Sequence, residues 1–248
     1  TSAGNVLGGI IYNRRTLTPV GDLNLDGNVN KNKVTANVNI FGGILNNENS
    51  SIQSINWKEV KDNIITATNN SVTGGFIQNK LGTIDKLHIN SFSGNTIDSN
   101  SKVDGGILYN ESGTVNGKLE IGQIIGNTIK AKTDINGLIA NVAGNINSIS
   151  IDSVSNNKFE MNFLRGGVIN LQGAKVNDIT IGEVNNNVIT GDESSTSTGF
   201  ILYLRELPTN QTIASNIGKL TVGKIHGNTI NATNITSLLF RSALVPVE

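Results

Sequence analysis

The chain has 248 residues with 19 basic and 19 acidic side chains, so its formal net charge is zero, and only 15% of its residues are charged. This balance gives no electrostatic footprint for nucleic acid or an anionic membrane, and no apolar run approaches the roughly 18 residues of a membrane-spanning helix. The absence of cysteine excludes disulfides, zinc–thiolate sites and thiol catalysis. Apolar residues make up 37% of the chain, which is enough for the core of one large domain or of a repeat array.

A short element, a small residue followed by glycine and two apolar residues, recurs seven times along the chain. The first copy is Gly8-Gly9-Ile10-Ile11, and the copies start near positions 8, 42, 74, 105, 136, 166 and 198. The spacings between these starts are 34, 32, 31, 31, 30 and 32 residues. A period of about 31 residues predicts a stack of repeated structural units.

Each copy is followed by an alternating apolar segment and then by a short polar step. The segment spaces its apolar residues as in Ile146, Ile149, Ile151 and Val154, and this pattern predicts a β-strand. Glycine and asparagine tolerate a positive φ, so the polar step predicts a corner of the chain. The corners are expected at Gly27-Asn28, Asp62-Asn63, Gly94-Asn95, Gly126-Asn127, Asn156-Asn157, Asn186-Asn187 and Gly227-Asn228.

These units predict an all-β fold, a parallel β-helix (β-solenoid) of about seven to eight coils with roughly 31 residues in each. No segment shows an apolar stripe long enough for a stable helix, and a unit of short strands buries its apolar face only against other copies. We expect one domain over residues 1–248, with stacked apolar columns inside, an asparagine ladder at the corner and an atypical C-terminal segment, 231–248. The leucine-rich repeat has a similar unit length, but these units lack a helix and carry an additional Gly-Gly strand.

Two insertions interrupt the period near the C-terminus. They cover residues 191–197 and 207–214. Insertions in a solenoid usually project from a coil as surface loops, and we expect the same here.

The order of motifs within one repeat resembles that of Gram-negative autotransporter passengers and related surface adhesins. Gly105-Gly106-Ile107-Leu108-Tyr109-Asn110 is followed by Gly113-Thr114-Val115 and Gly126-Asn127-Thr128, and Gly8-Gly9-Ile10-Ile11-Tyr12-Asn13 opens the chain similarly. Phe92-Ser93-Gly94-Asn95 also resembles a motif of chlamydial polymorphic membrane proteins. The likeness covers nearly the whole chain, and it implies a β-helical protein displayed on a bacterial surface.

The sequence predicts no catalytic, cofactor-binding or metal-binding residue and no cofactor. The two histidines, His88 and His226, occupy different positions of the repeat, the first on an outward-facing strand position and the second at a corner. The sequence has no metalloprotease helix motif, Walker loop or calcium-binding glycine repeat.

A glycan-cleaving β-helix is the enzymatic alternative, because such enzymes cluster carboxylates on one face. Three aspartates are expected at equivalent places between the first two apolar residues of the strand pattern, and stacking would bring the last two within about 5 Å. They are Asp85, Asp152 and Asp178. Other repeats fill this place with Ser54, Lys118 and Lys219, which favours an ordinary exposed strand position. The runner-up site would lie near Asp152, Asp178 and residues 191–197.

The two ends of the stack suggest how the protein works. A solenoid exposes strand edges at both ends, and low charge removes the repulsion that keeps such edges apart. We therefore expect a non-enzymatic extracellular or cell-surface structural or adhesive protein. Its first expected partner is a copy of itself, stacked head to tail through the N-terminal coil and segment 231–248 into a filament. The alternative for the ends is a segment of a longer passenger. A host surface or glycan is a further expected partner, and neither nucleic acid binding nor membrane insertion is expected.

Overall fold

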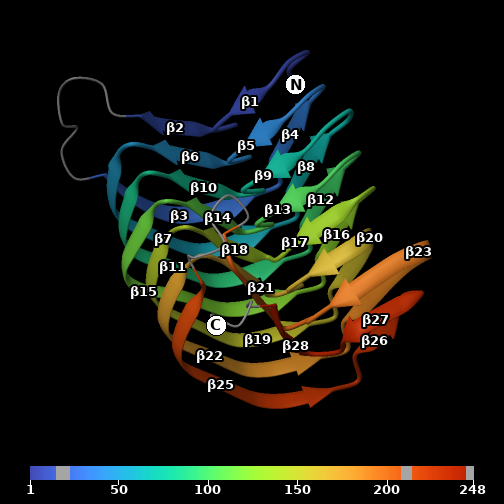
Figure 1. Ribbon diagram of the computed structural model, residues 1–248. Helices are drawn as coiled ribbons and strands as arrows, with labels where there is room; N and C mark the ends of the chain where they lie inside the picture. The colour runs from blue at the N-terminus through green and yellow to red at the C-terminus, as the bar shows by residue number, and fades with distance from the viewer. Residues whose placement is uncertain (15–22, 208–213, 244–248) are drawn as a thin grey trace.

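The three apolar segments of each repeat form strands of three parallel sheets, which wind into a solenoid (Figure 1). The structure is a computed structural model and describes residues 1–14, 23–207 and 214–243. Pairing between the strands is parallel throughout, and the described residues form strands and turns without a helix. The predicted all-β parallel β-solenoid is confirmed. None of the described residues belongs to a helix that is long and apolar enough to cross a membrane.

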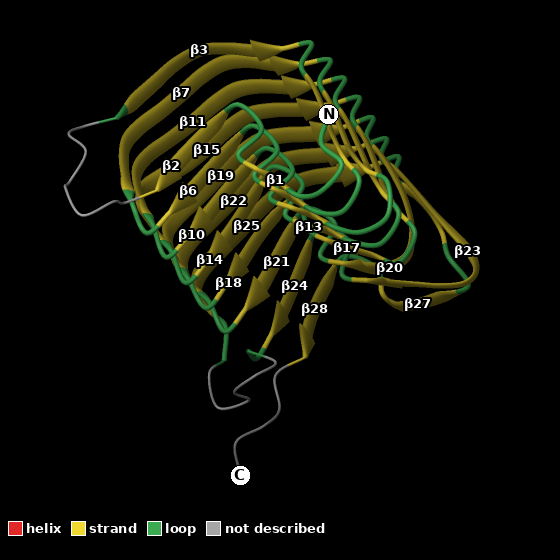
Figure 2. Cartoon of the chain, turned by 90° about the horizontal axis from the view of Figure 1, so that it is seen from above, coloured by secondary structure: helices red, strands yellow, loops and turns green. Residues whose placement is uncertain are grey.

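Most of the long strands form a curved seven-stranded sheet, and the strands of the other two sheets are short except for β20 and β23 (Figure 2). The seven-stranded sheet contains β3 (Asn24–Asn30), β7 (Ser51–Lys61), β11 (Thr83–Ser93), β15 (Thr114–Ile125), β19 (Asn145–Ser155), β22 (Lys175–Asn185) and β25 (Asn216–His226). The eight-stranded sheet contains β2 (Ile11–Arg14), β6 (Leu45–Glu48), β10 (Ile77–Lys80), β14 (Leu108–Glu111), β18 (Ile139–Val142), β21 (Ile169–Gln172), β24 (Leu202–Arg205) and β28 (Phe240–Ala243). The thirteen-stranded sheet contains β1 (Val6–Leu7), β4 (Lys33–Ala36), β5 (Ile40–Phe41), β8 (Ile64–Ala67), β9 (Val72–Thr73), β12 (Thr96–Ser99), β13 (Val103–Asp104), β16 (Thr128–Ala131), β17 (Asp134–Asn136), β20 (Lys158–Arg165), β23 (Val188–Thr198), β26 (Thr229–Asn231) and β27 (Asn234–Ser237).

The coil count differs slightly from the prediction. From β3 to β25 the seven-stranded sheet encloses six complete turns, against the seven to eight coils expected. Equivalent corner residues are 30 to 32 residues apart, except for 41 in the last turn. That longer turn contains the predicted insertion at 207–214, of which 208–213 lie outside the described residues.

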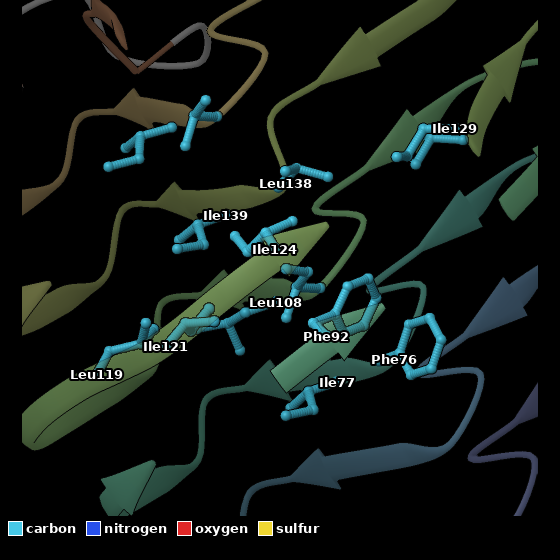
Figure 3. Close-up of a cluster of buried hydrophobic side chains, with 14 of the residues drawn as sticks. Phe76, Ile77, Phe92, Leu108, Leu119, Ile121, Ile124, Ile129, Leu138 and Ile139 are labelled. Atoms are coloured by element: carbon cyan, nitrogen blue, oxygen red, sulfur yellow. The ribbon is translucent and has the colours of Figure 1, made fainter. Parts of the chain in front are cut away.

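Equivalent apolar residues stack on one another through the interior. Ile89 pairs with Ile121, Ile121 with Ile151 and Ile151 with Ile181, and all four side chains are buried. Figure 3 shows the same stacking for further core residues, with the rings of Phe76 and Phe92 meeting edge to face at a centroid distance of 4.7 Å. The core is therefore one continuous set of columns that each coil extends.

The predicted asparagine ladder runs along the corner after each long strand. The backbone N–H and the side-chain Nδ2 of Asn95 both donate to Oδ1 of Asn127 in the next coil, at 2.8 and 3.0 Å. Asn127 repeats this arrangement toward Asn157. The ladder contains Asn32, Asn63, Asn95, Asn127, Asn157, Asn187 and Asn228.

The first corner lies four residues later than predicted. Gly27-Asn28 was expected to form it, but both residues lie within β3. Lys31 instead has a φ of 56°, and Asn32 begins the ladder. The Gly-Asn pair was misleading because Lys31, and not a glycine, occupies the left-handed corner position in this coil. A left-handed conformation costs lysine free energy that glycine would not lose.

A second asparagine ladder inside the eight-stranded sheet was not foreseen. Asn47 donates from Nδ2 to Oδ1 of Asn79 at 2.7 Å, and Asn79 donates likewise to Asn110 at 2.7 Å. The ladder begins at Asn13 and ends at Asn141, which pairs with Leu171. Its sequence signal is the asparagine that follows the Gly-Gly-x-apolar-x element in the first five repeats.

The strand register also shifts two coil starts by one residue. Gly106 donates to the carbonyl of Gly137, so Gly137 and not Asn136 stacks on the Gly-Gly turn of the preceding coil. In the same way Thr198 pairs with Arg165, which places Gly199 at the turn. The first residue of each turn must have a positive φ, and the residues that have it are Gly137 (72°) and Gly199 (59°).

The two C-terminal irregularities are more regular than expected. Residues 191–197 were predicted to be a surface loop and lie within β23. The pairing with β20 jumps from Met161–Gly191 to Phe163–Thr196, so the extra residues form a bulge in which 192–194 are exposed. Ser195 holds this stretch by donating from Oγ to the carbonyl of Asp192 at 2.7 Å. Within segment 231–248, β27 pairs with β23 and β28 pairs with β24, so residues 234–243 continue the coil, and 244–248 lie outside the described residues.

We expect the corner ladder to be a major contributor to stability. Asn127→Ala removes the acceptor of two Asn95 donors and leaves buried backbone groups unpaired. The free energy of unfolding should fall by about 2–5 kcal/mol, measured by urea denaturation. The control Asn177→Ala removes an exposed amide and should change it by less than about 0.5 kcal/mol. Equal effects of the two substitutions would refute the ladder's role.

The two kinds of glycine corner should differ in their tolerance of a side chain. Gly105 and Gly126 have φ values of 63° and 65°, but an added Cβ would lie 2.3 Å from the Leu108 carbonyl oxygen at Gly105 and within 4 Å of nothing at Gly126. Gly126→Ala should therefore cost about 1–2 kcal/mol, the price of the conformation alone. Gly105→Ala should cost at least about 3 kcal/mol more in the same denaturation assay. A similar cost at both sites would show that space at the Gly-Gly turn is not limiting.

Candidate functional site

The Gly-Gly turns fold the surface of the solenoid into a re-entrant corner. In one coil the chain passes from β13 through Gly105 into β14, and the left-handed conformation of Gly105 makes the bend. Asp104 lies before the turn and Tyr109 after it, and the Asp104 carboxylate is close enough to raise the pKa of the Tyr109 hydroxyl. Figure 2 shows the two walls of this corner, with β13, β17 and β20 on one side and β14, β18 and β21 on the other.

We name this feature the corner groove and define it by two rows of residues along the solenoid axis. The first wall, on the thirteen-stranded sheet, presents Leu7, Phe41, Thr73, Asp104, Asn136, Arg165 and Thr198. The second wall, on the eight-stranded sheet, presents Tyr12, Asn46, Gln78, Tyr109, Ala140, Asn170, Tyr203 and Arg241. The rows are polar and aromatic, in contrast with the aliphatic columns of the core.

All three tyrosines of the protein lie in the second wall of the corner groove. The register carries Tyr12 through two amide residues to Tyr109, and Tyr109 through Ala140 and Asn170 to Tyr203. Successive tyrosines are thus three coils apart, roughly 14 Å at the usual strand spacing. Aromatic residues make up only 4% of the chain, so composition alone gives no sign of such a row. The sequence signal for this row is the shared position of the tyrosines, four residues after the positive-φ glycine of the Gly-Gly turn.

A network of polar contacts closes the middle of the corner groove. Asn136 donates from Nδ2 to Oδ1 of Asp104 at 2.6 Å, and the Lys102 ammonium lies 2.7 Å from the same carboxylate. Asn170 donates to the Arg165 carbonyl at 3.1 Å, which links the two walls directly. The middle of the groove is therefore occupied by the protein's own side chains.

The corner groove also collects most of the unpaired buried polar atoms. Among all the described residues, five buried side-chain nitrogen or oxygen atoms have no hydrogen-bond partner. Four of the five belong to the groove or its rim: Asn46 Oδ1, Asn136 Oδ1, Arg205 Nε and Arg241 Nε. Such atoms are rare in folded proteins because leaving them unpaired costs free energy. Their concentration in one surface feature marks it as a candidate binding site.

Burial shifts the pKa of one group in the groove, Tyr109, and of one at its rim, Arg205. Desolvation raises the pKa of Tyr109 well above its usual value of 10, and the nearby Asp104 and Glu111 carboxylates raise it further. Desolvation lowers the pKa of Arg205, whose Nη2 donates to Oε1 of Gln172 at 2.6 Å. Both shifts reflect a groove interior that is poorly accessible to water.

The raised pKa of Tyr109 predicts an alkaline loss of stability. Because the folded pKa exceeds the unfolded value of about 10, the unfolded state releases a proton that the native state keeps, and stability falls as pH rises above about 10. Tyr109→Phe should reduce this loss when urea midpoints at pH 9 and pH 11 are compared. Tyr12→Phe, which removes a more exposed phenol, is the control and should have a smaller effect. An unchanged pH dependence in Tyr109→Phe would contradict the assignment.

The corner groove opens into a pocket at its N-terminal end. This cavity of about 290 Å³ is lined by residues of the first three coils, among them Tyr12, Phe41, Asn46 and Gln78. The Tyr12 hydroxyl donates to Oε2 of Glu48 at 2.5 Å, and this hydrogen bond is the main cause of the raised pKa of Tyr12. The pocket combines two aromatic rings with two amide side chains.

A second surface depression, of about 470 Å³, lies over β8, β12 and β16. Its lining includes Thr66, Asp98, Lys130 and Lys132. Lys130 also lies 4.0 Å from Glu160 in the next coil. No aromatic ring lines this depression, and its charges alternate in sign along the axis.

The predicted cluster of aspartates does not form. Asp178 pairs with Ser148, four residues before Asp152 in β19, so strand geometry separates the two aspartates by roughly 13 Å along the sheet. The expectation of about 5 Å was wrong because Asp152 follows Ile151, the third apolar residue of the pattern, and was assigned to the wrong gap. Asp85 instead accepts a hydrogen bond from Asn116 at 2.7 Å.

The two histidines lie on the exposed face of the seven-stranded sheet. His88 is 3.4 Å from Glu120, and His226 is 2.8 Å from Glu183 of the preceding coil. Lys118 also binds Glu120, and its hydrogen bond is the largest of the contacts that lower the pKa of that carboxyl. Within the described part of the chain, no group of three or more histidine, aspartate or glutamate side chains could hold a metal ion.

The fold and the site define a parallel β-solenoid with a polar, tyrosine-bearing groove along one corner. Comparisons with protein-family models, curated proteins and solved structures found no match for this chain. No relative therefore supplies a function, and the geometry of the ends and of the groove must carry it.

Proposed function

We propose that this protein is a non-enzymatic extracellular structural or adhesive β-solenoid whose copies stack head to tail into a surface filament. The observation that supports this best is the complementarity of its two end faces. Each face presents what the opposite face uses inside the stack: apolar columns and one half of an asparagine ladder.

The apolar columns of the core reach both end faces. At the C-terminal face Leu220 is 38% exposed, whereas Ile179, the next residue in its column, is fully buried. At the N-terminal face Ile10 is 53% exposed, whereas Ile44, whose carbonyl accepts its N–H, is buried. Stacking a second copy on either face would bury this surface, and burial of apolar area is the main driving force of association.

The corner ladder has a direction that favours head-to-tail stacking. In every coil the backbone N–H and Nδ2 donate toward the C-terminal neighbour, as Asn187 does to Oδ1 of Asn228 at 3.0 and 2.9 Å. The C-terminal face thus ends on the donors of Asn228, and the N-terminal face ends on Oδ1 of Asn32. In a stack of copies, Asn228 of one molecule would donate to Asn32 of the next and continue the ladder.

The columns of the two faces also match in side-chain type. Following the register through the sheet, a stacked copy would place Leu25 on Leu220 and Val29 on Ile225. Lys219 and Lys224 would meet Asn24 and Asn28, so the contact brings no like charges together. A contact between two different faces is heterologous and does not close, so it propagates into a fibre.

A surface location agrees with the composition of the chain. Cysteine is absent and charge is low, and the repeat motifs resemble those of bacterial surface adhesins. The exposed face of the seven-stranded sheet would form the side of the filament and could contact a host surface.

Glycan binding is a second candidate function, favoured by the three tyrosines of the corner groove. Aromatic faces and amide groups are the usual partners of sugars, and the groove presents both along the axis. The groove does not include Asp152 and Asp178, the aspartates of the glycan-cleaving site considered in the sequence analysis.

Two end-face substitutions test the stacking. Ile10→Glu and Leu238→Glu each place a charge on one face, and each variant should be monomeric in sedimentation velocity and show no fibres by electron microscopy. An equimolar mixture should form dimers that do not grow, because each variant keeps one intact face. The control Ile64→Glu adds the same charge to the side of the solenoid next to Lys33 and should leave the fibres unchanged. Monomers of the unmodified chain at all concentrations would refute the proposal.

A further inference from the structure

The pocket at the N-terminal end of the corner groove has the make-up of a sugar site. Tyr12 projects a 39% exposed ring into it from β2, and Phe41 lines it from β5 on the opposite wall. Asn46 and Gln78 lie in the same row as Tyr12, one and two coils further on. A flat apolar surface beside convergent amides suits a pyranose ring, which has an apolar face and a rim of hydroxyl groups.

Asn46, which lines the pocket, has a buried side-chain oxygen that no donor of the described residues reaches. Asn46 is 3% exposed, and among the described residues its Oδ1 has no hydrogen-bond partner. A purely apolar ligand would leave this oxygen unpaired at a cost in free energy. A sugar hydroxyl would donate to it and at the same time accept from a neighbouring amide.

The charges around the pocket favour a neutral ligand. Glu48 accepts a hydrogen bond from Tyr12, and Arg14 approaches the same phenol with the opposite charge. Lys80 lies 3.5 Å from Glu111 of the next coil. Because the positive and negative groups offset one another, neither a polyanion nor a polycation is selected.

An extended peptide fits the pocket less well than a sugar. Peptides that add to a sheet need an unpaired strand edge. The second wall of the pocket is built on β2, β6 and β10. β6 and β10 are paired on both sides, and the one free edge, that of β2, faces the N-terminal end of the stack. The pocket therefore offers side chains and not backbone groups to its ligand.

From these four observations we propose that the N-terminal pocket of the corner groove binds a pyranose unit of a neutral oligosaccharide. The ring stacks on Tyr12 against Phe41, and one hydroxyl donates to Oδ1 of Asn46. The pocket spans the coils of Tyr12, Asn46 and Gln78, about 10 Å at the usual strand spacing, so one or two sugar units fill it. The proposal rests on the glycan-binding function proposed above as the second candidate, and it requires neither catalysis nor stacking of the protein.

Isothermal titration calorimetry on the full-length Leu238→Glu variant tests the proposal without interference from fibres, so its outcome is independent of the stacking proposal. The probes are hexasaccharides of β-1,4-glucose, β-1,3-glucose, α-1,4-glucose, β-1,4-mannose and β-1,4-N-acetylglucosamine, with hexagalacturonate as an acidic comparison. At least one neutral probe should bind with one-to-one stoichiometry, and its disaccharide should keep most of the affinity.

Two substitutions locate the site. In the same background, Asn46→Leu and Tyr12→Ala should each weaken the binding by at least about tenfold, which corresponds to the loss of one buried hydrogen bond or one ring contact. Asn46→Leu removes an unpartnered oxygen, so its thermal midpoint should stay the same or rise, which separates lost binding from lost folding. The matched control Asn177→Leu, on the exposed face of the seven-stranded sheet, should bind as before.

Three results would overturn the proposal. The first is the failure of every neutral probe to bind at millimolar concentration. The second is binding by the Asn46→Leu and Tyr12→Ala variants that is as tight as binding by the Leu238→Glu parent. The third is tighter binding of hexagalacturonate than of any neutral probe.

Discussion

Parallel pairing of each coil with the next, at a fixed register, is the constraint on which this structure depends. It places equivalent residues of successive repeats on top of one another, so that isoleucine meets isoleucine in the core and asparagine meets asparagine at the corner. The backbone groups at the corners would otherwise be buried without partners, and the two ladders of amide side chains pair them. A single coil has neither a buried face nor paired edges, so the fold is stable only as a stack.

The same stacking explains where function can reside. Outward-facing residues at equivalent positions also stack, so they form rows along the surface just as inward-facing residues form columns in the core. The re-entrant bend at the Gly-Gly turns brings two such rows face to face. In the middle coils these rows satisfy one another, as Asn136 and Asp104 do. In the first coils they leave a cavity of about 290 Å³ between Tyr12 and Phe41. A repetitive scaffold thus acquires a local site through small differences between repeats.

The proposed assembly and the proposed sugar site use different consequences of the repeat. Stacking of copies uses what every coil shares, the apolar columns and the direction of the corner ladder. Sugar binding uses what distinguishes one coil from another, the particular residues of the corner groove. If both hold, a filament would display one pocket per molecule along its side, which suits a surface adhesin because repeated weak sites act together.

The all-β solenoid, its period and the corner ladder could be predicted from the sequence, because they follow from local rules: strand alternation, left-handed corners and the need of a small unit to stack. Features that depend on register were misplaced. Assigning Asp152 to the wrong gap of the strand pattern put it beside Asp178, although the two are four residues out of register. A Gly-Asn pair concealed the true first corner at Asn32. Two features became visible only in the folded chain: residues 191–197 belong to a strand, and Tyr12, Tyr109 and Tyr203 share one wall of a groove. The physical reason is that a groove is made by two segments on either side of a bend, and the direction of that bend is set by packing between coils.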